Sequence, residues 1–234
     1  MGKKTYVIAT VDNDAKPSFV DNQDRSTKKP ITLLTNTHRA IIRIAKLTKQ
    51  EKRLTSKIKW RLVQENFPLG ILLNENTHYF DGCIFTNATG ERIFLMVALP
   101  KNISQAITDM ALEEWGSIHR ITHLGTLEDL LFRQYTQLEK NHEKETPHAQ
   151  WIVFPQDEGF RILHINNGLP GGAYYISNRE GFREAELARV WEIASTQSAV
   201  MLDCDEVDIG WIKESLPYLT TIETGIKYPS IIGL

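Results

Sequence analysis

The sequence predicts an α/β protein built from two lobes, and three observations lead to this fold class. Short strand-like runs alternate with amphipathic helical segments along most of the chain. The same rhythm occurs on both sides of the polar, charged stretch Glu139–His148. The second half opens with three strand-like runs before its first helix. We therefore expect a first lobe over residues 1–148, with an inserted α/β segment, and a second lobe over residues 149–234.

The first lobe is predicted to begin with a strand, a turn and a return strand. Thr5–Val11 is rich in residues that favour strands, residues 12–14 are a turn signal, and Ser18–Val20 is the return strand. In Thr37–Leu47, isoleucines recur on roughly helical spacing, which predicts a helix. The remaining expected elements of this lobe are a hairpin of His78–Thr86 with Glu91–Leu99, a helix over Ser104–Trp115, a strand over Ile118–Leu124 and a helix over Leu127–Leu138.

A basic amphipathic helix is predicted over Thr48–Asn66. Thr48 and Glu51 have the spacing of a capping box, and Leu54, Ile58 and Leu62 recur on one face. The polar face is strongly basic, and its candidate partner-binding residues are Lys49, Lys52, Lys59 and Arg61. Such a face suits an acidic protein surface or an anionic membrane surface. A solvated helix face opposite a core stripe produces the same pattern.

The second lobe has a recognisable order of elements. Its expected strands and helices are Gln150–Pro155, Phe160–Asn166, Leu169–Ser177, the helix Arg179–Ala194, Ala199–Asp203 and the helix Ile209–Leu216. This β-β-β-α-β-α order is typical of a ribonuclease-H-like lobe, the building block of actin-like proteins. The predicted fold class is therefore α/β, a two-lobed actin-like (ribonuclease-H-like) fold.

Composition and charge narrow the function classes. The chain has 234 residues with 41% hydrophobic and 24% charged residues, as in an ordinary globular protein. The net charge of -2 hides an asymmetry, because residues 1–66 carry 15 basic against 6 acidic residues. The two cysteines form no CxxC pair, and no apolar run reaches the roughly 18 residues that span a bilayer. We expect a cytoplasmic protein, and no nucleic-acid partner is predicted.

Residues for binding a nucleotide are sparse. An actin-like phosphate grip needs a glycine-bearing hairpin with an Asp near the start of each lobe, because glycine lets the backbone approach phosphate. The matching turn of the first lobe, residues 12–16, offers Asp12 but no glycine, and that of the second lobe, residues 156–159, offers Asp157 and Gly159. Asp12, Asp157 and Gly159 are therefore the candidate residues for MgATP, although the sequence favours no cofactor.

Other chemical constellations have simpler structural explanations. The glycine-rich segment Gly168–Gly172 lacks the Gly-Lys-Ser/Thr of a phosphate loop, so a tight turn between two strands is expected. The acids between Asp203 and Asp208 are local in sequence, which favours capping of the next helix by Asp208 over a metal site. The dispersed histidines form no metal motif, and no catalytic residue is predicted.

Several stretches together resemble a known family. Arg53–Leu73 ("RLTSKIKWRLVQENFPLGILL"), Ile93–Gly116 ("IFLMVALPKNISQAITDMALEEWG"), Thr122–Arg133 ("THLGTLEDLLFR") and Trp151–Ser177 are similar to the actin-like cytoplasmic domain of bacterial assembly-platform proteins. These are the L component of the type II secretion inner-membrane platform and its type IV pilus counterpart, the M protein.

The resemblance implies a cytoplasmic position at the inner face of the inner membrane, with the assembly ATPase and inner-membrane platform subunits as partners. The M proteins bind ATP through a glycine-bearing N-terminal hairpin, and this chain departs from that pattern at Asp12–Lys16. In the L component a transmembrane helix follows the domain, so we expect either a further segment after Leu234 or an anchor on another subunit. The main hypothesis is a non-enzymatic scaffold, and the alternative is an active actin-like ATPase or small-molecule kinase.

Overall fold

The computed structural model of the chain describes residues 5–12, 14, 16–20, 31–48, 51, 54–70, 72–116, 121–141, 149–156, 159–177, 190, 197–215 and 219–226. The chain divides into two compact units. Unit 1 comprises residues 1–84 and 92–130, and unit 2 comprises residues 85–91 and 131–234. The predicted lobe boundary at residues 148 and 149 stays a prediction.

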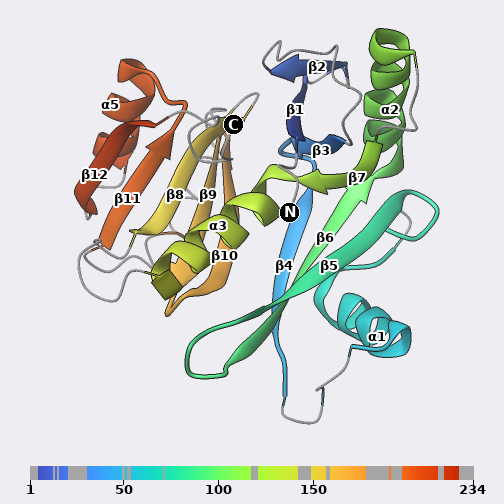
Figure 1. Cartoon of the computed structure of the whole chain (residues 1–234), viewed down its shortest axis with the longest axis horizontal. Coiled ribbons are helices and arrows are strands. Elements are labelled where there is room, and N and C mark those ends of the chain that lie inside the picture. The colour runs from blue at the N-terminus through green and yellow to red at the C-terminus, as the bar shows by residue number, and fades with distance from the viewer. Residues whose placement is uncertain are drawn as a thin grey trace. The chain divides into compact units, whose positions relative to one another are not determined.

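Unit 1 contains a four-stranded sheet in the order β2-β1-β3-β7 (Figure 1). Its strands are β1 (Thr5–Val11), β2 (Pro17–Val20), β3 (Ile31–Asn36) and β7 (Ile121–Thr126). β1 runs antiparallel to β2 and parallel to β3, and β3 runs parallel to β7. Helix α2 (Lys101–Trp115) shares a hydrophobic core with this sheet, and the Trp115 ring stacks on Phe19 of β2 at 4.9 Å. The expected opening hairpin of the first lobe is thus confirmed.

A three-stranded antiparallel sheet and a short helix form the inserted part of unit 1. The strands β4 (Ile41–Lys46), β6 (Arg92–Pro100) and β5 (His78–Thr86) lie in the order β4-β6-β5. Helix α1 (Ser56–Asn66) covers the sheet through Leu62 and Val63, which pack with Phe94 and Met96 of β6. The predicted hairpin of β5 and β6 is confirmed, and the glycine of its turn, Gly90, has a positive φ of 82°.

The helix predicted over Thr37–Leu47 is wrong, because β4 occupies this segment and pairs in antiparallel register with β6. Ile42 and Ala45 are its buried residues, and their three-residue spacing imitates a helical stripe. The prediction that one helix runs from Thr48 to Asn66 is also wrong at its start. Helix α1 begins at Ser56, and Thr55, whose hydroxyl accepts a hydrogen bond from the Ile58 N–H, is its N-cap.

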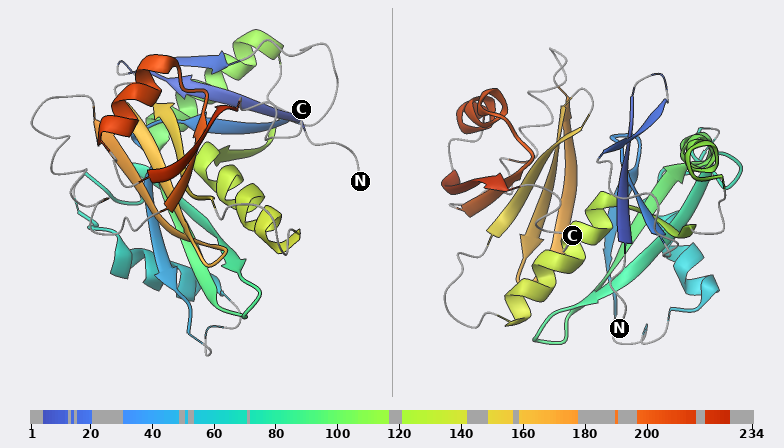
Figure 2. Two further views of the ribbon diagram at one scale, coloured as in Figure 1. Left: turned by 90° about the vertical axis from the view of Figure 1, so that its left-hand side faces the viewer. Right: turned by 45° about the horizontal axis from the view of Figure 1, so that its top comes forward.

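Unit 2 contains a five-stranded sheet in the order β10-β9-β8-β11-β12 (Figure 2). Its strands are β8 (Ala149–Gln156), β9 (Gly159–Asn166), β10 (Leu169–Ser177), β11 (Gln197–Leu202) and β12 (Leu219–Ile226). β8, β9 and β10 form an antiparallel meander, and β8, β11 and β12 run parallel. The sheet therefore has the three meander strands and two parallel strands expected of a ribonuclease-H-like lobe.

The helices of unit 2 agree in part with the sequence prediction. α5 (Glu206–Ser215) packs through Ile212 into a core that contains Trp151, Val153 and Ile162. The chain enters the unit through α3 (Leu127–Asn141), which matches the predicted helix over Leu127–Leu138. The helix predicted over Arg179–Ala194 lies outside the described residues except for Val190, which is buried in the same core.

Candidate functional site

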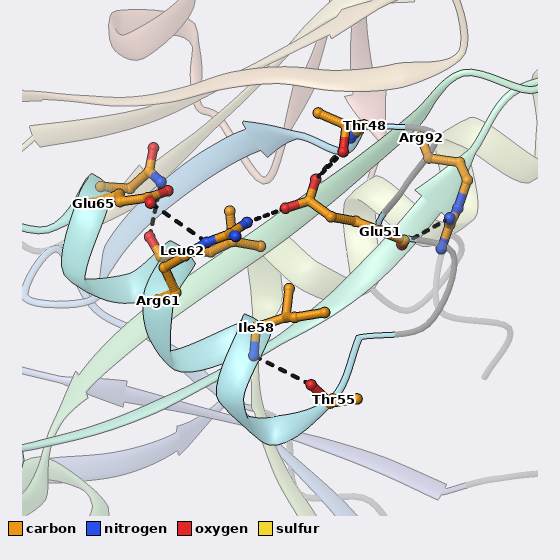
Figure 3. Close-up of polar contacts among 9 residues, drawn as sticks. Thr48, Glu51, Thr55, Ile58, Arg61, Leu62, Glu65 and Arg92 are labelled. Carbon is orange, nitrogen blue, oxygen red and sulfur yellow. Dashed lines mark hydrogen bonds and ion pairs between the residues drawn. The ribbon is translucent and has the colours of Figure 1, made fainter.

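The segment before helix α1 is held in place by Glu51. The backbone N–H and the hydroxyl of Thr48 donate hydrogen bonds to Glu51 Oε2 at 2.8 and 2.9 Å, and the Glu51 N–H donates to the Thr48 carbonyl at 3.0 Å (Figure 3). Thr48 and Glu51 are thus paired, but the predicted capping box is wrong: the Thr48 hydroxyl donates to the carboxylate and does not accept the Glu51 N–H, and the pair closes a turn ahead of the helix. Arg92 of β6 donates from Nη1 to the Glu51 carbonyl at 3.1 Å, which ties this turn to the sheet.

Arg61 is the second anchor of Glu51. Its Nη2 donates to Glu51 Oε1, and its Nε lies 3.4 Å from Glu65 Oε1, one helical turn further along α1 (Figure 3). The hydrogen bonds from Thr48 and the positive charge of Arg61 hold the pKa of Glu51 below its ordinary value. Arg61 thus stands between two carboxylates, and part of its positive charge is already neutralised within unit 1.

Lys59 also has an acidic neighbour. Its Nζ lies 3.8 Å from Asp81 Oδ1 of β5 and 6.0 Å from the centre of the Phe94 ring. The side chains of Lys59 and Asp81 are both exposed, so this ion pair contributes little stability and can open to a partner. Lys57, on the same helix, is exposed. The other two predicted partner-binding residues, Lys49 and Lys52, are outside the part of the chain that the structure describes.

In the turn between β1 and β2, the Asp12 carboxylate is hydrogen-bonded within the turn. Asp12 is exposed, its Oδ1 accepts a hydrogen bond of 2.7 Å from the Lys16 N–H, and its own N–H donates to the Lys16 carbonyl at 3.1 Å. Asp12 therefore closes the turn as a side-chain acceptor. Because Lys16 N–H points at the carboxylate, it does not point outward, where a backbone cradle for phosphate would need it.

The turn between β8 and β9 includes Gly159, and its glycine has a structural role. Gln156 pairs with Gly159 at the end of the antiparallel ladder. A Cβ placed at Gly159 would lie 2.0 Å from the carbonyl oxygen of Ile176 on β10, so only glycine fits against this strand. Asp157 falls outside the described residues. Asp12 belongs to unit 1 and Gly159 to unit 2.

The acidic segment that follows β11 forms a reciprocal helix cap. The Asp208 N–H donates to Asp205 Oδ1 at 2.8 Å, and the Asp205 N–H donates to Asp208 Oδ2 at 3.1 Å. The prediction that Asp208 precedes and caps the helix is wrong in its residue, because α5 begins at Glu206: Asp205 precedes the helix, and Asp208 pairs with it from the first turn. Among the described residues, no group of three or more His, Cys, Asp or Glu side chains is placed to hold a metal ion.

The glycine-rich segment between β9 and β10 is a strand turn. Asn167 and Gly168 have positive φ angles of 51° and 69°, as in the Asn-Gly turns that connect two antiparallel strands. Gly171 and Gly172 lie within β10. The expectation of a turn in place of a phosphate loop is therefore confirmed.

Sequence reasoning missed Asp81 and Arg92 as neighbours of the basic helix. Asp81 lies on β5, 22 positions after Lys59, and Arg92 begins β6. Asp81 contacts Lys59 and Arg92 contacts Glu51, and in both pairs the residues are far apart in sequence. The spacing of residues along the chain does not predict such contacts. Glu51 was expected as a cap but not as the partner of Arg61.

Comparisons by sequence find no relative. No protein-family model matches the chain, and no curated protein matches it.

Comparisons by structure show the fold. The chain superposes on a Bacteroides thetaiotaomicron protein with an actin-like ATPase fold and unknown function at a TM-score of 0.53 and 7% identity, over 98% of this chain and 92% of that chain. It superposes on the PilM–PilN type IV pilus biogenesis complex at a TM-score of 0.57 and 11% identity, over 98% and 91%.

A third structure that resembles the chain is the cytoplasmic domain of EpsL, an inner-membrane component of the Vibrio cholerae type II secretion system. The TM-score is 0.49 with 8% identity, over 84% of this chain and 80% of that chain. Together with the sheet order of unit 2, the first two similarities confirm the fold class that the sequence predicts. The chain has the two-lobed, actin-like ATPase fold.

Proposed function

We propose that the chain is a non-enzymatic scaffold of a bacterial type IV pilus or type II secretion assembly platform. It acts at the cytoplasmic face of the inner membrane and binds the assembly ATPase and membrane subunits of the platform. The fold supports this role, because it is shared over nearly the whole chain with a component of a pilus biogenesis complex. No helix among the described residues is long and apolar enough to cross a membrane.

The observation that carries the non-enzymatic part of the proposal is the state of the β1–β2 turn. An actin-like ATPase needs backbone N–H groups free to bind phosphate and an Asp free to position a metal ion. In this chain the Asp12 carboxylate and the Lys16 N–H are bonded to each other at 2.7 Å. Binding phosphate through the Lys16 N–H would require this hydrogen bond to be replaced.

The partner-binding part of the proposal rests on helix α1. Lys57 is exposed, and the ion pair of Lys59 with Asp81, at 3.8 Å, is exposed as well. With Lys49 and Lys52 they form the basic residues that we propose to bind an acidic partner surface. Arg61 contributes less, because Glu51 and Glu65 already flank it. On this proposal Lys57 and Lys59 bind the partner, whereas Arg61 is held within unit 1 by Glu51 and Glu65.

Co-expression with the platform subunits tests this role. The chain, tagged at one end, is expected to retain the assembly ATPase or a membrane subunit on an affinity column at low salt. Lys57→Glu with Lys59→Glu should reduce the retained amount, because the partner surface is acidic. Charge reversal at Lys213, an exposed lysine of α5 in unit 2, is the matched control. Retention of no subunit by the unaltered chain would contradict the proposal.

The alternative function, an actin-like ATPase or small-molecule kinase, uses Asp12, Asp157 and Gly159 to bind MgATP. The structural similarity to the Bacteroides thetaiotaomicron protein, which has an actin-like ATPase fold, supports this alternative. It predicts binding of MgATP that is lost in Asp12→Ala. The scaffold proposal predicts that Asp12→Ala changes only the stability of the turn.

A further inference from the structure

The hairpin of β5 and β6 is divided between the two units. Residues 78–84 and 92–100 belong to unit 1, whereas the tip, residues 85–91, belongs to unit 2. The chain passes between the units at three places, and two of them, after residues 84 and 91, are in this hairpin. The third, after Leu130, is within helix α3. A movement of one unit against the other must therefore bend the chain at these connections.

Phe85 attaches the first arm of the tip to unit 2. Its side chain is buried, its ring meets the Phe132 ring edge-on with the ring centres 6.3 Å apart, and the Arg133 guanidinium lies 5.8 Å from its ring centre. Two residues earlier, Cys83 donates from Sγ to Asp129 Oδ1 at 2.9 Å, and both of these residues belong to unit 1. The first connection of the hairpin thus lies between a residue held in unit 1 and a residue held in unit 2.

Asn87 attaches the turn of the tip. Its Oδ1 accepts hydrogen bonds from the Glu91 N–H at 2.9 Å and from the Thr89 hydroxyl at 2.8 Å, and these bonds close the turn. Its Nδ2 donates to Glu91 Oε2 at 2.9 Å and to the carbonyl of Asn167, in the β9–β10 turn of unit 2, at 3.3 Å. The same buried side chain therefore closes the turn and ties it to the β9–β10 turn.

The second arm repeats the pattern of the first. Glu91 is bonded to Asn87 within the tip. The next residue, Arg92, donates to the Glu51 carbonyl at 3.1 Å, and its own carbonyl accepts from the Leu47 N–H at 2.9 Å, all within unit 1. On both arms, residues one or two positions apart are therefore anchored in different units. Anchors on either side confine bending to one or two residues, as in a hinge.

We propose that residues 85–91 form a strap, which docks on unit 2 and, while docked, limits bending at the two hairpin connections. The strap undocks when it loses the contacts of Phe85 and the hydrogen bond from Asn87 to Asn167, while its own turn stays closed. At 3.3 Å this hydrogen bond is long, so it costs little to break. Local opening of this kind is common in folded proteins. The strap is a property of the hairpin and does not depend on the proposed platform role.

An exchange of two side chains tests the strap without opening its turn. In Asn87→Asp with Glu91→Gln, the introduced carboxylate keeps the acceptor of the turn, and the introduced amide restores a donor to it, at unchanged net charge. The carboxylate cannot donate to the Asn167 carbonyl, so this link is lost. Hydrogen exchange of the amides of residues 85–91 should become about fivefold faster. Unchanged exchange of these amides would overturn the proposal.

Spin labels measure the movement of one unit against the other. They are attached at Lys57→Cys on α1 and Val207→Cys on α5, two exposed positions, in a chain with Cys83→Ser and Cys204→Ser. The exchange variant should broaden the distribution of distances between the labels. Thr89→Val is the matched control, because it removes a hydrogen bond within the turn and leaves the donor to unit 2 in place, so it should not broaden the distribution. No broadening in the exchange variant, or equal broadening in the control, would overturn the proposal.

Discussion

Gly159→Ala separates a structural glycine from a phosphate-binding glycine. An added Cβ would lie 2.0 Å from the Ile176 carbonyl oxygen, where ordinary contacts begin near 3.4 Å, so β9 and β10 must separate by about 1.4 Å. Overpacking of this kind costs roughly 1–3 kcal/mol. The gain from a less flexible unfolded chain is about 0.4–1 kcal/mol. We expect a net loss of up to about 2.6 kcal/mol, which corresponds to a fall of roughly 5–10 °C in melting temperature for a chain of this size.

Trp211 is a suitable reporter for this loss, because its ring stacks on Phe160, the neighbour of Gly159, at 4.9 Å. Urea unfolding followed by tryptophan fluorescence should show an earlier transition in Gly159→Ala. The matched control is Gly210→Ala, since Gly210 lies within α5 and a Cβ there meets nothing within 4 Å. Alanine should stabilise that helix by roughly 0.5–1 kcal/mol. If Gly159→Ala unfolds like the wild type but loses MgATP binding, the structural explanation is refuted.

Three further predictions concern charge and pH. Because the pKa of Glu51 is lowered in the folded state, the stabilisation from its carboxylate is present above the unfolded pKa and is lost as pH falls. The melting temperature of Glu51→Gln should therefore depend less on pH below about pH 5 than that of the wild type. An equal pH dependence in the two proteins would contradict this. Burial against Trp151 lowers the pKa of His164, so as pH falls the unfolded chain binds a proton before the folded chain does, and stability should fall below about pH 6.5. In His164→Gln the melting temperature should fall less steeply with pH in this range. An unchanged pH dependence would exclude His164 as its source. Arg61→Glu should lower the melting temperature while Lys57→Glu should not, because Arg61 is paired with Glu51 and Lys57 is exposed; calorimetric melts that rank the two variants the other way would refute this division.

The fold could be predicted largely where a strand or helix has a local signature. The hairpin of β5 and β6 follows from two strand-like runs around a turn with Gly90, and α2 from its apolar spacing. β4 was mistaken for a helix because Ile42 and Ala45 are buried three residues apart. β12, Leu219–Ile226, was not predicted, since it contains Glu223 and Gly225 and takes its place through parallel pairing with β11.

The candidate site was less predictable, because it depends on contacts distant in sequence. The sequence showed the basic residues of α1, but it did not show which of them have acidic partners. Glu51 and Arg61 are ten residues apart, and α1 begins only at Ser56, so no helical spacing relates them. Asp12 was identified as a turn residue, whereas its hydrogen bond to the Lys16 N–H required the structure. These pairings determine which basic residues of α1 are open to a partner and whether the Asp12 turn presents its backbone N–H groups to a phosphate.

Titration calorimetry with MgATP tests the central claim that this actin-like fold acts as a scaffold without nucleotide chemistry. The account predicts no binding heat for the wild type and none for Asp12→Ala, since the Asp12 carboxylate and the Lys16 N–H are bonded to each other. Binding in the micromolar range, about −8 kcal/mol, that disappears in Asp12→Ala would contradict the account and establish the ATPase or kinase alternative.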